Sequence, residues 1–169
     1  MRIIGVFIGS LVFLASQNAL AVDLTNRLGI GLSQQMGAVD VPMITAHYYP
    51  NPRFAISGAI GIDTKRDDSK FGVLGKVRRV VFTENQMNFY MGGAAGYSTH
   101  DEYNSSTARF EDKNNFEISA IIGGEFFFTG LDSLALMFET GIGVVTGDGG
   151  SRFRTIADNP FMAGIVFYF

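Results

Sequence analysis

Alternation of apolar residues with small or polar ones is the feature that most constrains this sequence. It recurs in eight segments of about 8 to 12 residues. Residues 54–62 read FAISGAIGI, and residues 116–128 read FEISAIIGGEFFF. A period of two places alternate side chains on opposite faces of a β-strand. The pattern therefore predicts an all-β protein of eight strands, each with one apolar face.

The connections between these segments alternate in length. Three are short, at Pro50–Pro52, Thr83–Gln86 and Thr129–Ser133. Four are longer and polar, and we expect loops there, at Met36–Asp40, Thr64–Lys70, Thr99–Asn115 and Thr146–Asn159. Short turns at one end and long loops at the other are typical of an antiparallel up-and-down barrel that crosses a membrane.

A soluble eight-stranded calyx would share the period but would turn its apolar face inward. Two observations favour the membrane barrel. The non-apolar face consists mostly of Gly, Ala and Ser, and only 17% of all residues are charged, whereas a water-facing surface is rich in charged residues. Aromatic residues stand near the ends of the apolar face, as Phe89 and Tyr97 do in one segment, and such girdles mark the two membrane interfaces.

The N-terminus has the pattern of a secretory signal peptide. Met1 and Arg2 form a short positive region, Ile3–Ala15 is apolar, and the residues before Ala21 suit cleavage after it. An apolar helix of this length spans about 20 Å, less than the roughly 30 Å of a bilayer core. We therefore expect residues 1–21 to be a signal peptide and residues 22–169 to be one barrel domain.

The final strand carries apolar residues at alternate positions and ends in phenylalanine. This strand resembles the C-terminal assembly signal of Gram-negative outer-membrane barrels, and residues 22–169 resemble the small OmpA/OmpX/OmpW-like eight-stranded type. The resemblance implies location in the outer membrane of a Gram-negative bacterium, contact with its lipid and lipopolysaccharide, and recognition by the outer-membrane assembly machinery. The residues that would carry this signal are Phe161, Ile165, Phe167 and Phe169.

Three positive and three negative residues fall on the face that would line the lumen. They are Arg27, Lys76, Arg78, Glu117, Glu125 and Glu139. An unpaired charge in a narrow lumen is costly, so we expect this balanced set to pair and hydrogen-bond across the barrel. The same residues would also permit an ion-conducting path.

Several other chemistries find little support in the sequence. The chain has no cysteine, which excludes disulfides and thiolate metal sites, and its net charge of -3 without a basic cluster gives no footprint for nucleic acid. His100 lies among Ser98, Asp101 and Glu102, but a polar loop alone does not specify a catalytic geometry. We expect no enzymatic activity, no metal and no cofactor.

The sequence leaves three functional classes open. The first is a non-enzymatic outer-membrane barrel whose extracellular loops contact a host, prey or other surface ligand, or which maintains the envelope. Its candidate recognition residues are Tyr103, Arg109, Phe110, Arg152, Phe153 and Arg154. The second is a small channel or lateral path for ions or apolar molecules, and the third is a lipid A-modifying enzyme. Against a channel, large inward residues should fill the lumen, namely Leu74, Tyr90, Ile121, Phe127, Met137 and Tyr168.

Overall fold

The protein is an all-β barrel. The structure, a computed structural model, describes residues 22–34, 41–66, 68–105, 109–155 and 162–169. The predicted signal peptide, residues 1–21, lies outside these ranges and stays a prediction. None of the described residues forms a helix that is long and apolar enough to span a bilayer.

Eight strands form the closed ring, and one further short strand pairs with a single strand of that ring. The strands are β1 (Leu28–Ser33), β2 (Met43–Asn51), β3 (Phe54–Asp63), β4 (Lys70–Glu84), β5 (Met87–Asn104), β6 (Arg109–Phe128), β7 (Leu131–Gly147), β8 (Gly150–Thr155) and β9 (Met162–Tyr168). Each of β1 to β7 pairs antiparallel with the next, β7 also pairs with β9, and β9 pairs with β1 and closes the ring. The predicted eight-stranded antiparallel barrel is confirmed.

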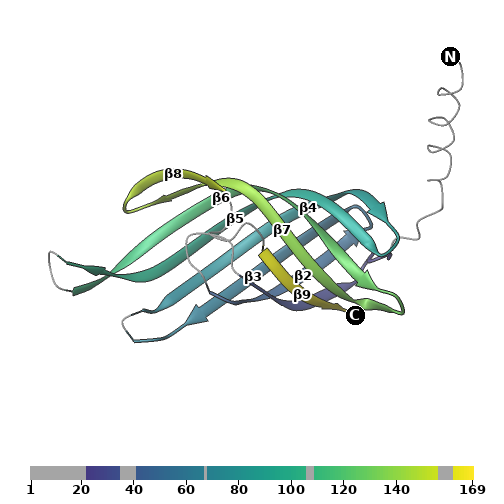
Figure 1. The fold of residues 1–169 in the computed structure, drawn as a ribbon, viewed down its shortest axis with the longest axis horizontal. Helices are drawn as coiled ribbons and strands as arrows, with labels where there is room; N and C mark the ends of the chain where they lie inside the picture. Colours follow the sequence, from purple (N-terminus) through teal and green to yellow (C-terminus); the bar gives the residue numbers. More distant parts are fainter. Residues whose placement is uncertain (1–21, 35–40, 67, 106–108, 156–161) are drawn as a thin grey trace, which may run out of the picture.

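The two ends of the barrel differ (Figure 1). At one end, which we name the turn end, two-residue turns join β2 to β3, β4 to β5 and β6 to β7. Gln86 and Gly130 have φ values of 67° and 81° in two of these turns, a region that glycine adopts without strain. At the opposite end, which we name the hairpin end, β3–β4, β5–β6 and β7–β8 project as hairpins (Figure 1).

Two of the long loops predicted from the sequence are instead paired strands. The ladder between β5 and β6 continues to Asn104 opposite Arg109, and β7 turns at Asp148–Gly149 into β8. The prediction of loops over Thr99–Asn115 and Thr146–Asn159 is therefore wrong for the described part of these segments. Polar residues in these segments pair as readily as apolar ones, because ladder hydrogen bonds are made by the backbone. Of the other two predicted loops, Met36–Asp40 lies outside the described residues, and the described part of Thr64–Lys70 joins β3 to β4, except that Lys70 already begins β4.

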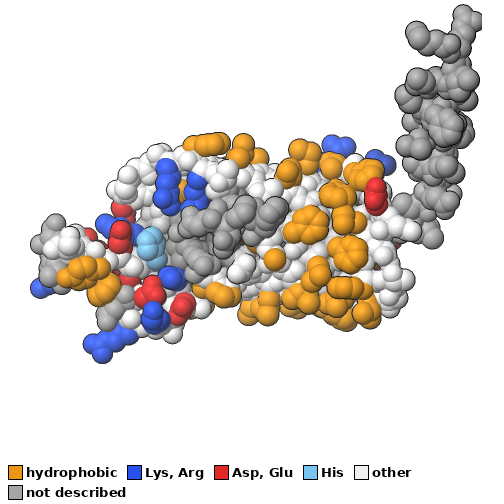
Figure 2. All heavy atoms as spheres, in the orientation of Figure 1, with side chains coloured by type: hydrophobic (Ala, Val, Ile, Leu, Met, Phe, Trp, Pro, Cys, Tyr) orange, Lys and Arg blue, Asp and Glu red, His pale blue; other side chains and the backbone are white. Residues whose placement is uncertain are grey.

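The outer face of the barrel is an apolar belt (Figure 2). Register aligns its side chains across strands, as Ile60 lies opposite both Ile44 and Val73. The belt includes Leu28, Ile30, Leu32, Ile44, Ile56, Ile60, Ile62, Val73, Val77, Val81, Met91, Tyr97, Phe116, Ile118, Ile122, Leu136, Ile142, Val144, Ile165 and Phe167, all exposed. Charged side chains gather at the hairpin end (Figure 2). An apolar surface of this size and shape requires a non-aqueous environment.

The inner face carries the alternate residues. Those of the predicted filling set, Leu74, Tyr90, Ile121, Phe127, Met137 and Tyr168, are all buried. One expectation fails: the alternation predicts that Leu24 faces outward with Leu28, but Leu24 is 2% exposed and packs in the core beside Tyr49 and Tyr168. A turn at Thr25–Asn26, with φ of 60° at Asn26, interrupts the period before β1 begins.

Candidate functional site

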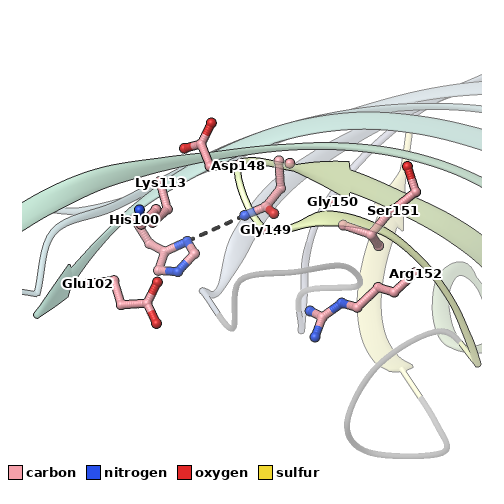
Figure 3. A pocket seen from close by; sticks show the side chains of 11 residues that line it. His100, Glu102, Lys113, Asp148, Gly149, Gly150, Ser151 and Arg152 are labelled. Carbon is pink, nitrogen blue, oxygen red and sulfur yellow. Dashed lines mark hydrogen bonds between the residues drawn. The ribbon is translucent and has the colours of Figure 1, made fainter. Parts of the chain in front are cut away.

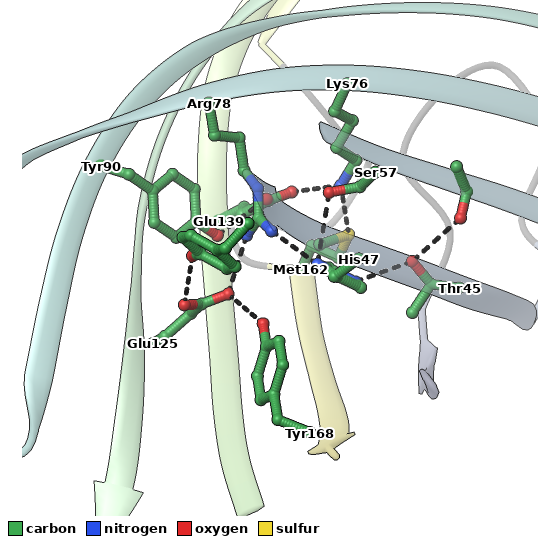
Figure 4. Close-up of polar contacts among 12 residues, drawn as sticks. Thr45, His47, Ser57, Lys76, Arg78, Tyr90, Glu125, Glu139, Met162 and Tyr168 are labelled. Atoms are coloured by element: carbon green, nitrogen blue, oxygen red, sulfur yellow. Dashed lines mark hydrogen bonds and ion pairs between the residues drawn. The ribbon is translucent and has the colours of Figure 1, made fainter. Parts of the chain in front are cut away.

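Four of the charged residues predicted to lie in the lumen meet there in one buried cluster (Figure 4). Lys76 and Arg78 are alternate residues of β4, so both point inward, toward Glu125 of β6 and Glu139 of β7. All four are buried, with Arg78, Glu125 and Glu139 at most 1% exposed. Lys76 forms an ion pair with Glu139, and Arg78 Nη1 lies 3.0 Å from Glu125 Oε1.

Tyrosines complete the coordination of both carboxylates. Glu125 accepts hydrogen bonds from the hydroxyls of Tyr49, at 2.6 Å, and Tyr168, at 2.7 Å. Glu139 accepts one from Tyr90 at 2.7 Å. The Arg78 guanidinium also lies 4.7 Å from the centre of the Tyr90 ring. Each buried carboxylate therefore has a cation and at least one hydroxyl donor, which offsets its loss of water.

His47 extends the cluster toward β2 and β3 (Figure 4). Arg78 Nη2 lies 2.5 Å from His47 Nδ1, and a guanidinium can only donate, so Nδ1 accepts. Nε2 therefore carries the proton and donates to Thr45 Oγ1 at 2.8 Å, and Thr45 donates to the carbonyl of Gly58 at 3.3 Å. The imidazole is neutral and orients the guanidinium. Its 3.3 Å contact with Ser57 Oγ fixes its ring further.

Two members of the predicted charge network lie elsewhere. Arg27 is only half-buried at the turn end, where it donates to the carbonyl of Tyr168 at 2.7 Å and to Ser133 Oγ at 2.7 Å. It precedes β1 by one residue, so it reaches strand ends rather than the centre of the lumen. Glu117 is buried toward the hairpin end but forms no ion pair with a described residue.

Sequence reasoning missed His47, Thr45, Ser57 and Tyr49 as members of the cluster. The signal was present, because residues 45, 47 and 49 are Thr, His and Tyr on the face opposite Ile44 and Ala46. Their partners come from strands distant in the sequence, so the period places them inward without showing what they contact.

The hairpin end holds a polar pocket of about 430 Å³ (Figure 3). Side chains from β5, β6 and β8 line it, including His100, Glu102, Lys113, Asn115 and Arg152. His100 Nδ1 lies 3.5 Å from the side-chain Nδ2 of Asn115. Among the described residues, no group of three or more His, Asp or Glu is placed to hold a metal ion.

The structure does not assemble the Ser98–Glu102 segment into a catalytic triad. Ser98 is buried and His100 contacts Asn115, whereas Asp101 Oδ2 accepts hydrogen bonds from Ser69 N at 3.0 Å and Ser69 Oγ at 2.9 Å. Alternation along β5 puts Asp101 on the opposite face from His100, and although Ser98 and Glu102 share the face of His100, no hydrogen bond joins either one to His100 among the described residues.

The six candidate recognition residues divide between the two faces of the hairpins. Arg152 lines the pocket, and Arg154 follows on the same side of β8. Tyr103 and Phe110 form an exposed ring pair, with centroids 5.3 Å apart, while Phe153 is 69% exposed. Arg109 is exposed at the start of β6. These residues do not form one site.

Of the predicted assembly residues, Ile165, Phe167 and Phe169 are exposed on the outer face. Phe169 and Leu28 exchange backbone hydrogen bonds of 2.9 and 3.2 Å across the seam between β9 and β1. Phe161 lies outside the described residues. Recognition of this strand by assembly machinery stays a prediction.

Comparison with solved structures matches the whole barrel. The N-terminal β-barrel domain of Pseudomonas aeruginosa OprF aligns with a TM-score of 0.57 at 13% identity, covering 86% of this chain and 98% of that one. Neisserial surface protein A (NspA) aligns with a TM-score of 0.54 at 13% identity, covering 85% and 95%. This chain has the fold of the small OmpA-like outer-membrane barrels. The predicted location, the outer membrane of a Gram-negative bacterium, agrees with these neighbours.

No protein-family model matches the sequence, and no curated protein matches it. The match is therefore one of fold, and the role of the barrel has to be argued from its own residues.

Proposed function

We propose that the protein is a non-enzymatic outer-membrane barrel that presents the hairpin end to the outside of the cell, where it contacts surface ligands or maintains the envelope. One observation carries this proposal: an apolar belt surrounds a lumen filled by a buried ionic cluster, and paired hairpins project beyond the belt. A barrel that is closed inside and elaborated at one end is suited to display a surface.

The hairpin end offers the features expected of a contact surface. Tyr103 and Phe110 are about half exposed, and the polar row of Asp101 and Asp112 separates them from the belt residues Tyr97 and Phe116. Tyr103, which pairs with Phe110, lies about 20 Å from Tyr97 along β5 at 3.3 Å per residue. These rings therefore lie beyond the lipid-facing girdle and are available to a partner.

Orientation is tested by single cysteines, because the chain has none of its own. Lys65→Cys lies at the hairpin end and Asn85→Cys in the β4–β5 turn, and both positions are exposed. In intact cells we expect a membrane-impermeant maleimide to label Lys65→Cys but not Asn85→Cys, and to label both after the outer membrane is permeabilised. Labelling of Asn85→Cys alone in intact cells would reverse the proposed orientation.

The role of the hairpins is tested in cells that lack the protein. We expect the wild type to restore growth in SDS with EDTA, binding to a surface ligand, or both. Tyr103→Ser with Phe110→Ser should abolish only the binding to a surface ligand. Full recovery of both by this variant would overturn the assignment of the ring pair. A changed lipid A acyl pattern in cells without the protein would instead support an enzyme.

A further inference from the structure

Two exposed arginines lie at the turn end, close to the apolar belt. Arg79 interrupts the outward row of β4, which otherwise carries Val73, Val77 and Val81. Arg53 lies in the β2–β3 turn. Both are exposed, and neither guanidinium forms an ion pair or a hydrogen bond with another described residue, although Arg53 N donates to Asn51 Oδ1 at 3.0 Å.

Strand pairing holds the two arginines next to each other. Arg79 lies opposite Phe54 in the β3–β4 ladder, and Val80 N donates to the carbonyl of Arg53 at 2.9 Å. The backbone of Arg53 therefore lies opposite Val80, next to Arg79, and both arginines belong to the rim at the turn end.

Both arginines line one hollow of about 620 Å³, together with the apolar residues Val81 and Phe82. Phe82 is 53% exposed and Val81 54% exposed. Asp23 also lines the hollow, and its carboxylate accepts hydrogen bonds from Thr25 N and Thr25 Oγ1, at 2.9 and 2.5 Å. The hollow therefore presents two guanidiniums against one carboxylate, a net positive charge, beside an apolar surface that continues into the belt. Figure 2 shows positive side chains next to the apolar belt at this end.

A charge on the lipid-facing side is costly unless it reaches the interface or an anion. Guanidinium binds phosphate through paired hydrogen bonds, and the exposed valine and phenylalanine suit an acyl chain. We propose that Arg53 and Arg79 bind the phosphodiester headgroup of a phospholipid in the leaflet at the turn end, with its acyl chain against Val81 and Phe82. This inference rests on the proposed membrane orientation.

The test uses native mass spectrometry of the folded barrel in detergent with three probes. Phosphatidylglycerol offers phosphate and acyl chains, diacylglycerol offers only the chains, and inorganic phosphate offers only the anion. We expect one phosphatidylglycerol to bind at least about tenfold more tightly than either other probe. Equal binding of diacylglycerol would overturn the role of the arginines, and equal binding of inorganic phosphate would overturn the assignment to a lipid.

Variants locate the site. We expect Arg53→Gln with Arg79→Gln to weaken phosphatidylglycerol binding about tenfold or more. The matched control, Lys65→Gln with Arg66→Gln, removes the same charge at the hairpin end and should bind as the wild type does. Equal affinity in all three proteins would refute the site. A change of mobility on gels between boiled and unboiled samples verifies folding, and Arg53→Gln alone is measured if the double variant does not fold.

The cysteine labelling described above separates two kinds of failure. If labelling gives the proposed orientation but the double variant binds phosphatidylglycerol normally, only the lipid site is wrong. If the protein is recovered in the soluble fraction and neither cysteine is protected from the maleimide in intact cells, the proposed function fails as well.

Discussion

At the scale of single residues, the lumen shows how a buried charge is tolerated. Glu139 has Lys76 on one carboxylate oxygen and Tyr90 on the other, and Glu125 has Arg78 and two tyrosines. Neither pair is necessarily more stable than an apolar filling of the same volume, but loss of one member leaves a buried charge alone.

Glu139→Gln is expected to destabilise the barrel by about 3–5 kcal/mol, because Lys76 then lacks a counter-charge. The measurement is the urea midpoint of the folded band on unboiled gels. Glu102→Gln, in the open pocket at the hairpin end, serves as control and should change stability by no more than about 0.5 kcal/mol. Lys76→Met with Glu139→Leu should recover most of the loss. If Glu139→Gln changes the urea midpoint no more than the control does, the charge of Glu139 is not needed to stabilise the buried Lys76.

At the scale of elements, the hairpins are tied to one another as well as to the barrel. Ser69, in the β3–β4 turn, donates its amide and hydroxyl to Asp101 of β5, and these hydrogen bonds hold the pKa of the Asp101 carboxyl below its ordinary value. Asp112 lies opposite on β6, and its hydrogen bond and charge contact with Asp101 raise the pKa of Asp112.

Acid should weaken the attachment of the β3–β4 turn to β5, in which the backbone hydrogen bond from Asp101 N to the carbonyl of Ser69 remains. The folded-state pKa of Asp101 is lowered, so its contribution is fully present above the unfolded pKa of about 3.9 and is lost as pH falls through the lower folded value. Asp112, with its raised pKa, takes up a proton first. We expect the Ser69 amide resonance in micelles to shift only in the lower step. Asp101→Asn should abolish the lower step. If the Ser69 amide resonance still shifts in the lower step in this variant, Asp101 does not cause it.

The seam between β1 and β9 depends on close approach of two backbones. A Cβ at Gly31 would collide with the carbonyl oxygen of Ile165, and a backbone atom cannot move aside without parting the strands. Gly31→Ala should therefore lower the yield of the folded, heat-modifiable barrel.

Gly58→Ala is the matched control, because a Cβ at Gly58 has no neighbour within 4 Å. We expect this outward-facing variant to fold as the wild type does. Equal folding yields of Gly31→Ala and Gly58→Ala would show that the seam tolerates the added methyl group.

At the scale of the whole molecule, the barrel separates an apolar outside from a filled inside. The ionic cluster joins β2, β4, β5, β6, β7 and β9, so it cross-links the ring as well as closing it. Arg78, Glu125 and Glu139, at most 1% exposed, leave little room for water.

The closed lumen predicts no conduction. In planar bilayers at neutral pH and moderate salt, we expect folded wild-type protein to give no reproducible unitary steps. Insertion is verified by labelling of Lys65→Cys from one side of the same membrane. Current steps of constant size, whose frequency increases with the amount of protein added, would instead favour the channel that the sequence leaves open.

The sequence by itself determined the strands, their two faces and the class of barrel, because a period of two depends only on backbone geometry and on which side chains avoid water. It placed Lys76, Arg78, Glu125 and Glu139 inward for the same reason. The tertiary structure decided what local pattern does not encode. Register brought His47 to Arg78 and Tyr168 to Glu125, the turn at Asn26 moved Leu24 inside, and backbone pairing turned polar segments at the hairpin end into strands. Each of these contacts joins residues far apart in the chain or depends on a backbone turn, so only closure of the ring fixes them.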